Sequence, residues 1–179
     1  MRRSDLYETI RPLFLRNQIT TFQELFNHVP DTAVAGSLGK RTERFRELIK
    51  NVDQFKIEEI ILMAKLFRLD LKDMFVLLER ELARLYADRL IIRSNLQNIV
   101  AMYEEKKILR LTDVFKYLTI KDIAAAIGER RVRLAQMKSS IKKLPLRLPI
   151  HVGLYSNLSI GDTLRLIEED YLLQNKVSI

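Results

Sequence analysis

The sequence predicts an all-α protein in which two related helical bundles follow one another, joined by a long helical connector. Helix-breaking residues are few, with only five Gly and four Pro in 179 residues. Apolar residues recur three and four positions apart, the spacing of one helix face. A third observation, an internal repeat, indicates that the chain contains the same bundle twice. The length is sufficient for two compact domains.

The repeat emerges when the chain is compared with itself at an offset of 89 residues, which aligns 22–48 with 111–137. Apolar positions keep their character along the match, while the positions between them change. The identical pairs are Phe26 and Phe115, Ala35 and Ala124, Gly39 and Gly128, Arg41 and Arg130, and Arg44 and Arg133. We therefore interpret the match as a duplication.

Beyond the matched segment, we expect the second copy to contain an insertion of 14 residues, so that Ile57 aligns with Ile160. The inserted stretch holds Pro145 and Pro149, and two prolines four residues apart are unfavourable in a helix interior. An extended loop or a short strand is the expectation for 144–150.

Local signals divide the first copy into a series of helices. Thr20 or Thr21 can cap the first of them, and Glu24 completes a capping box with Thr21. Asp31 caps the second helix, and Gly39 suits a left-handed turn after it. The predicted helices of this copy cover 22–29, 32–38, 41–50, 57–68 and 71–93.

Ala35 is followed four residues later by Gly39, and Ala124 is followed in the same way by Gly128. A small residue lets two helices cross closely, and Gly makes the tight turn between them. Flanking apolar residues complete the pattern: Val34, Leu38, Phe45 and Leu48 in the first copy, and Ile123, Ile127, Leu134 and Met137 in the second. With these residues, about 19–80 and 108–172 resemble the lambda-repressor-like helix-turn-helix family. The resemblance implies two tandem helix-turn-helix bundles.

The resemblance also implies that the second helix of each motif enters the major groove of DNA, where its early residues reach base edges. Arg41 and Arg44 would then contact guanine, Gln136 would contact adenine, and lysines would contact phosphates. The DNA-binding residues implied in the first copy are Lys40, Arg41, Thr42, Arg44, Arg46 and Lys50. Those in the second copy are Arg130, Arg131, Arg133, Gln136, Lys138, Lys142 and Lys143. Alternatively, these bases form an ordinary solvated helix face.

Charge distinguishes the two copies. The net charge is +8, and 129–150 contribute seven bases against one acid. In the first copy, Glu43 and Glu47 stand among the bases of 41–50. Either these acids read cytosine amino groups, or this copy no longer contacts DNA. The second copy is the stronger candidate for DNA binding.

The sequence places the first module at 1–80, the connector at 81–107 and the second module at 108–179, with its proline-containing insertion near 141–155. An apolar stripe and the absence of Gly and Pro predict a long helix over 71–107, with a break near Ser94 and Asn95. Its apolar residues either pack against the modules or form the seam of a homodimer.

Several classes of function are not expected. The chain has no Cys and only two His, far apart at His28 and His151, so we expect no metal site. No glycine-rich phosphate loop or nucleophile–base pair is present, so we expect neither an enzyme nor a cofactor. Apolar runs are too short for a bilayer and no signal-peptide pattern follows the amino terminus, so we expect no membrane partner and a cytoplasmic location.

Taken together, the sequence predicts a protein that binds double-stranded DNA, of the kind that regulates transcription in bacteria or phages. Its recognition helices would lie near 41–50 and 130–140. The alternative is a structural or protein-interaction component, such as a virion or adaptor protein, that reuses a duplicated helix-turn-helix fold.

Overall fold

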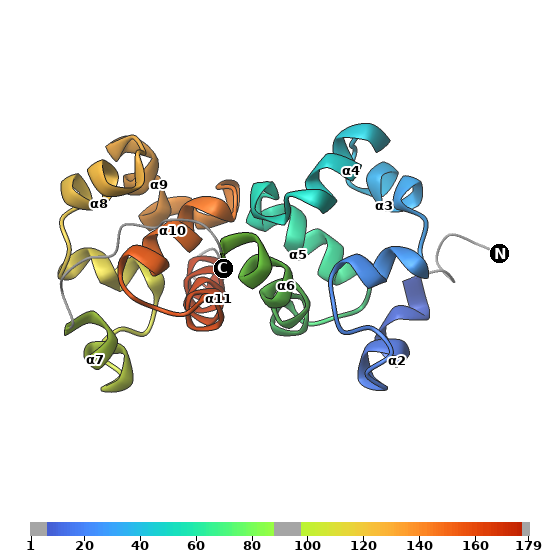
Figure 1. The fold of residues 1–179 in the computed structure, drawn as a ribbon, viewed down its shortest axis with the longest axis horizontal. Helices are drawn as coiled ribbons and strands as arrows, with labels where there is room; N and C mark the ends of the chain where they lie inside the picture. Colours follow the sequence, from blue (N-terminus) through green and yellow to red (C-terminus); the bar gives the residue numbers. More distant parts are fainter. Residues whose placement is uncertain (1–6, 88–97, 177–179) are drawn as a thin grey trace. The chain divides into compact units, whose positions relative to one another are not determined.

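A computed structural model describes residues 7–87 and 98–176, and these residues form helices and turns without any strand (Figure 1). The prediction of an all-α protein is confirmed. The chain separates into two compact units, unit 1 (residues 1–87) and unit 2 (residues 88–179). Among the described residues, no helix combines the length and the apolar character that a membrane crossing requires.

Unit 1 consists of helices of one to four turns around a shared core. Its elements, with η for a 3-10 helix, are α2 (Ile10–Leu15), η1 (Gln23–Asn27), α3 (Asp31–Ser37), α4 (Thr42–Lys50), η2 (Val52–Gln54), α5 (Ile57–Leu66) and α6 (Leu71–Tyr86). The sequence predicted α3, α4 and α5 close to these bounds, but it placed the end of the last helix at 93, whereas α6 ends at Tyr86. It did not predict α2, and it predicted an α-helix where the shorter 3-10 helix η1 forms.

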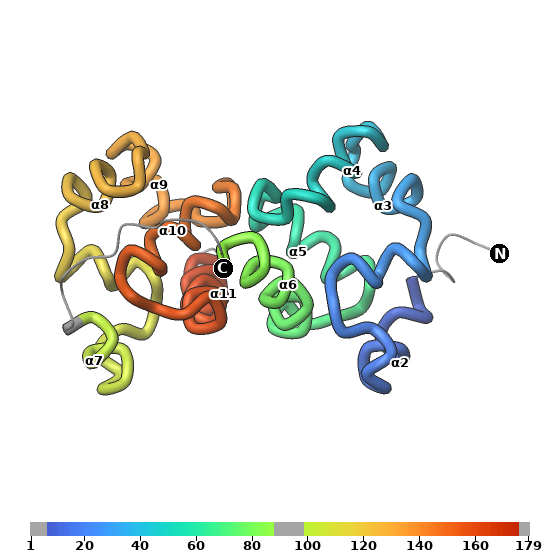
Figure 2. Tube along the Cα trace, in the orientation of Figure 1, coloured from blue at the N-terminus to red at the C-terminus, as the bar shows by residue number. Residues whose placement is uncertain are grey.

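Unit 2 repeats the same order of elements (Figure 2). They are α7 (Asn98–Glu104), η3 (Leu111–Lys116), α8 (Ile120–Ile127), α9 (Arg131–Ser140), η4 (Ile141–Lys143), α10 (Arg147–Tyr155) and α11 (Ile160–Lys176). Each begins 88 to 90 residues after its counterpart in unit 1. The repeat therefore extends over the whole described chain, well beyond the segment in which sequence similarity reveals it.

Backbone conformation repeats with the same offset. Each described residue with a positive φ has a partner 89 residues away that also has a positive φ. The pairs are Asn17 (56°) and Lys106 (58°), Gly39 (64°) and Gly128 (68°), and Arg68 (55°) and Asn157 (64°). Only the middle pair is glycine in both units, which is why the other two turns escape a search for turn residues. The left-handed turn predicted at Gly39 is confirmed.

The predicted insertion in unit 2 is wrong. η4 and α10 occupy the places that η2 and α5 occupy in unit 1, so Ile57 corresponds to Leu146 and not to Ile160. Pro149 is the third residue of α10, and Pro145 precedes the helix. The first-turn N–H groups of a helix have no partner within it, so proline is tolerated there. Of the loop or short strand expected at 144–150, only 144–146 are non-helical, and residues 147–150 form the first turn of α10.

The predicted connector is divided between the units. The apolar stripe of α6, including Met74, Phe75, Leu78 and Leu82, is buried in unit 1, as the packing alternative expected. α7 belongs to unit 2. The predicted break near Ser94 and Asn95 lies outside the described residues.

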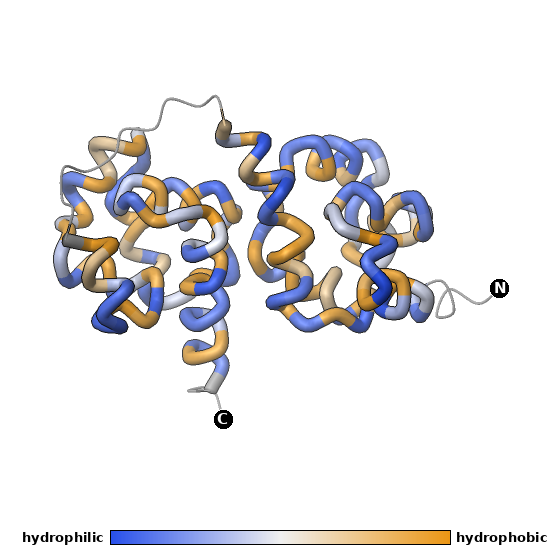
Figure 3. The backbone as a smooth tube through the Cα atoms, turned by 60° about the horizontal axis from the view of Figure 1, so that its bottom comes forward, coloured by the Kyte–Doolittle hydropathy of each residue, from blue (hydrophilic) through white to orange (hydrophobic). Residues whose placement is uncertain are grey.

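The two cores are filled differently on the same frame. In unit 1, four phenylalanine rings pack edge to face with centroids 5.4–5.8 Å apart. They are Phe22, Phe26, Phe45 and Phe55, and their counterparts in unit 2 are Leu111, Phe115, Leu134 and Leu144. Along both units the trace alternates between hydrophobic and hydrophilic residues, as amphipathic helices around a core require (Figure 3).

Candidate nucleic-acid interface

The candidate DNA-binding residues lie on equivalent surfaces of the two units. We call residues 40–54 the α4 surface and residues 129–143 the α9 surface. In both, a buried alanine (Ala35 or Ala124) lies in the preceding helix, and its carbonyl accepts a 2.9 Å hydrogen bond from the backbone N–H five residues later. This bond closes the turn at Gly39 or Gly128. The backbone frame is therefore the same, and differences between the surfaces come from side chains.

Helix α4 is held in place by Phe45 and Leu48, and helix α9 by Leu134 and Met137, all of which are buried. The sequence predicted these anchors correctly. Most of the remaining residues of each helix are exposed, while Thr42, Ile49 and Ser140 are half-buried.

On the α4 surface, three of the predicted DNA-binding bases form ion pairs. Lys40 Nζ lies 2.6 Å from Glu59, and both side chains are largely buried. Arg44 pairs with Glu47 at 2.8 Å, and Arg46 pairs with Asp31. The hydrogen bond from Arg46 lowers the pKa of Asp31 and raises that of Arg46, so this pair stays charged and matched. These bases already have anionic partners.

The other predicted residues of the α4 surface are less constrained. Arg41 precedes α4 and Lys50 ends it, and both are exposed without an ion pair to any described residue. Thr42 is half-buried in the first turn. Two bases and one hydroxyl thus remain available to a ligand in unit 1.

On the α9 surface, a single acid serves two arginines. Glu129, with only 10% of its side chain exposed, lies 3.3 Å from both Arg133 and Arg147. The remaining bases form no ion pair among the described residues and are exposed: Arg130, Arg131, Lys138, Lys142 and Lys143. Lys138 Nζ lies 5.5 Å from the ring centroid of Phe115, a cation–π distance, and Gln136 is also exposed. Arg147, which is not among the predicted DNA-binding residues, lies next to the α9 surface through its ion pair with Glu129.

The shared frame allows the two surfaces to be compared position by position. Four acids lie on the α4 surface or form ion pairs with its bases, not counting the buried Asp53. Each of the four has an uncharged counterpart in unit 2. The pairs are Asp31 and Ile120, Glu43 and Val132, Glu47 and Gln136, and Glu59 and Leu148. Residues 129–143 carry six bases and one acid, against five bases and three acids in 40–54. The α9 surface is thus a concentrated region of positive charge.

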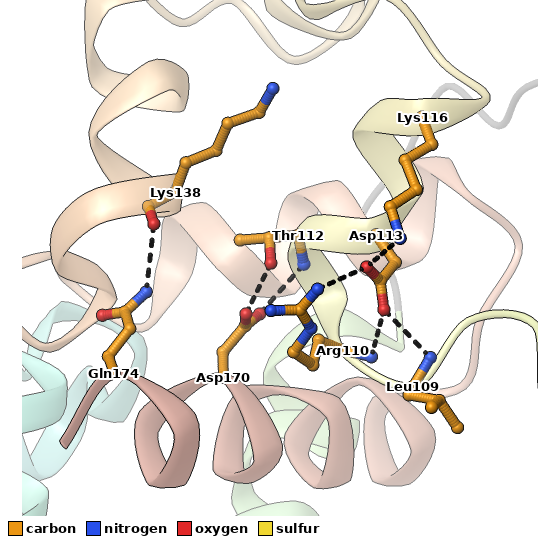
Figure 4. Close-up of polar contacts among 8 residues, drawn as sticks. All are labelled: Leu109, Arg110, Thr112, Asp113, Lys116, Lys138, Asp170 and Gln174. Atoms are coloured by element: carbon orange, nitrogen blue, oxygen red, sulfur yellow. Dashed lines mark hydrogen bonds and ion pairs between the residues drawn. The ribbon is translucent and has the colours of Figure 1, made fainter. Parts of the chain in front are cut away.

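Different side chains hold the end of each surface. In unit 1, the Tyr86 hydroxyl donates a 2.9 Å hydrogen bond to Asp53, which is buried. In unit 2, Lys142 takes the place of Asp53 and is exposed. Gln174 of α11 holds this end instead: its amide donates to the Met137 carbonyl and accepts from the Ile141 N–H, both at 3.2 Å. Figure 4 shows Gln174 reaching from α11 toward the end of α9 at Lys138. Because Gln174 does in unit 2 what Asp53 and Tyr86 do in unit 1, position 142 does not need a buried acid and carries an exposed lysine.

A second polar cluster fixes η3 to α11 (Figure 4). Asp170 accepts hydrogen bonds from the N–H and hydroxyl of Thr112 at 2.9 and 2.5 Å, and burial raises its pKa. Asp113 accepts from the N–H groups of Leu109 and Arg110 at 3.2 and 3.0 Å. Neither acid was singled out from the sequence. The capping box predicted at Glu24, shifted by 89 residues, would have identified Asp113.

Replacing Asp113 should show how much this cluster stabilises unit 2. Burial opposes its ionisation, but hydrogen bonds from Lys116, Arg110 and the backbone outweigh burial and lower its pKa below 3.8. A carboxylate whose pKa is lower in the folded than in the unfolded state stabilises the fold at pH values above its unfolded-state pKa. This stabilisation is lost as the pH falls through the folded-state pKa. Asp113→Ala should therefore lower the free energy of unfolding by about 1–3 kcal/mol near neutral pH, because two N–H groups lose their acceptor.

Chemical denaturation of wild type and variant at about pH 7 and about pH 3 measures this effect, and the difference should shrink at the lower pH. Glu169→Ala, which removes an exposed acid from α11, is the control and should change stability little at either pH. An equal loss at both pH values would contradict an ionised Asp113.

The part of the chain that the structure describes contains no group of three or more His, Asp or Glu residues suited to a metal ion. Comparison with known proteins gives no family model, no curated protein and no solved structure that matches this chain.

Proposed function

We propose that the chain is a DNA-binding protein, of the kind that regulates transcription, and that unit 2 contacts double-stranded DNA through the α9 surface. In this proposal both units are diverged helix-turn-helix bundles of the lambda-repressor-like kind. Exposed Arg and Lys side chains neutralise phosphates and release counterions, which supplies much of the affinity of proteins for DNA.

One observation carries the proposal: on the shared backbone frame, three of the five bases of the α4 surface form ion pairs, whereas on the α9 surface Glu129 is the one acid, and five of the six bases form no ion pair among the described residues. In unit 1, Glu59 pairs with Lys40 and Asp31 pairs with Arg46; in unit 2 these pairs are absent, and Arg130, Arg131, Lys138, Lys142 and Lys143 are exposed instead. A purely structural helix face gains nothing from unpaired like charges, which repel one another. An anionic partner would offset that repulsion.

A second candidate function is protein interaction, as in a structural or adaptor component. A groove of about 420 Å³ in unit 2 is lined in part by Leu109, Leu172 and Leu173, whose side chains are exposed. Their counterparts in unit 1 are Thr20, Ala83 and Arg84, so the fold does not require leucine there. Clustered exposed leucines are typical of protein contacts. A homodimer through 71–107 also stays a prediction.

The salt dependence of binding to a mixed-sequence DNA duplex tests the DNA-binding proposal. Wild type should lose affinity steeply as salt rises. Arg130→Ala combined with Arg131→Ala should bind about tenfold or more weakly and reduce the salt slope by about two, because two phosphate contacts are lost. Fluorescence anisotropy over a salt series gives both quantities.

The matched control removes two bases of the α4 surface that already have acidic partners. Arg44→Ala combined with Arg46→Ala makes the same change in net charge on the same frame, and its slope should stay near that of wild type. Equal effects of the two double variants would contradict the assignment to unit 2. Absence of binding at low salt would overturn the proposed function.

A further inference from the structure

The outward stripe of α9 is uncharged, although bases surround it. It consists of Val132, Ala135, Gln136 and Ser139, all exposed. These positions follow the i, i+3, i+4, i+7 spacing of one helix face. Val132 is 69% exposed, the highest value among the large hydrophobic side chains of the described residues. Neither the core nor an ion pair accounts for a valine in this place.

Cations stand on both sides of the stripe. Arg131 and Lys138, seven residues apart, share one side of the helix, while Arg133 lies on the other. A neutral centre with a cation on either side fits a helix in the major groove, which admits an α-helix between two phosphate strands. A surface that only bound phosphates would not need a neutral centre.

The same stripe of unit 1 is fully charged. The residues there are Glu43, Arg46, Glu47 and Lys50. The frame is therefore compatible with charge at these positions, and the uncharged stripe is a property of unit 2 alone. Exposed apolar side chains on a groove-facing helix have one complementary group on base edges, the C5 methyl of thymine.

We infer that α9 reads thymine through Val132, with Ala135 beside it. The inference rests on the proposed function and adds the class of site that unit 2 prefers, a duplex containing A·T pairs. Val132 buries its methyl groups against thymine methyls, and the flanking bases hold the helix between the strands.

The test removes the thymine methyl and nothing else. Duplexes that the full chain selects from a random pool are synthesised again with deoxyuridine in place of thymidine, and dissociation constants are measured at one salt concentration. Wild type should bind the deoxyuridine duplex about fourfold more weakly for each contacted methyl, the factor that corresponds to burying one such group. Val132→Ser should bind both duplexes almost equally.

Val76→Ser is the matched control, because Val76 is an exposed valine on α6 of unit 1, and it should keep the wild-type preference. Circular dichroism confirms that each variant is folded. Equal affinity of wild type for the two duplexes would overturn the inference and leave the proposed function intact. A preference that survives in Val132→Ser would also overturn it, and a chain that does not bind duplex DNA at low salt overturns both.

Discussion

Placing the two glutamates of unit 1 on the α9 surface should abolish DNA binding without unfolding the protein. Val132→Glu combined with Gln136→Glu reproduces Glu43 and Glu47 on the equivalent helix. Carboxylates brought against phosphates or base edges cost several kcal/mol, so affinity should fall by about 100-fold or more. The fold should persist, because both positions are exposed and α4 carries these acids on the same frame.

Anisotropy at low salt measures the loss, and circular dichroism confirms the helix content. The control adds two acids to exposed positions of unit 1, Gln18→Glu with Gln54→Glu, and so makes the same change in net charge. Its affinity should fall by only a few fold, since screened charges away from the contact act weakly. A comparable loss in both variants would mean that total charge, and not the α9 surface, determines binding.

The second large effect concerns the crossing of α10 and α11. A Cβ added at Gly153 would lie 2.1 Å from the Thr163 Oγ1 atom and 2.5 Å from its Cγ2 atom, and Thr163 is fully buried. Gly153→Ala therefore forces the two helices apart or Thr163 out of place. It should destabilise unit 2 by about 3 kcal/mol or more and lower its melting temperature by roughly 10 °C or more.

Gly36→Ala is the control, because nothing lies within 4 Å of the Cβ it adds to α3. This change should leave stability unaltered or raise it by about 0.5–1 kcal/mol, since Ala favours the helix. Thermal melts followed by circular dichroism compare the two. A Gly153→Ala protein that melts like wild type would show that α10 and α11 do not approach this closely. In unit 1, the counterpart of Gly153 is Ala64 and the counterpart of Thr163 is Met74.

The sequence predicted most of the secondary structure and the residues that anchor it. Helical spacing of apolar residues identified α3 to α6, and the repeat identified the paired turns at Gly39 and Gly128. Its largest error was the insertion in unit 2. Pro145 and Pro149 indicated a loop because a proline in a helix interior and a proline in the first turn look alike in a one-dimensional pattern. Only the position of the helix start separates them.

The candidate site was less accessible from the sequence, because a count of bases does not reveal which of them are paired. The partner of Lys40 is Glu59 and that of Arg46 is Asp31, and both acids lie on other helices. Val132 was not predicted as a site residue from the sequence, since an apolar residue within a helix is ordinarily assigned to the core. The predicted anchors Leu134 and Met137 lie on the opposite face of the helix, and this placement could have identified Val132 as exposed.

The sequence by itself determined that this protein is all-α and duplicated, because apolar spacing and glycine turns act locally and leave a pattern along the chain. Tertiary structure decided which bases of each copy are paired and which are exposed without an ion pair. Ion pairs form between residues that are distant in sequence, and their strength depends on separation in space, so Lys40 beside Glu59 and Lys142 in open solvent are indistinguishable until the helices are packed.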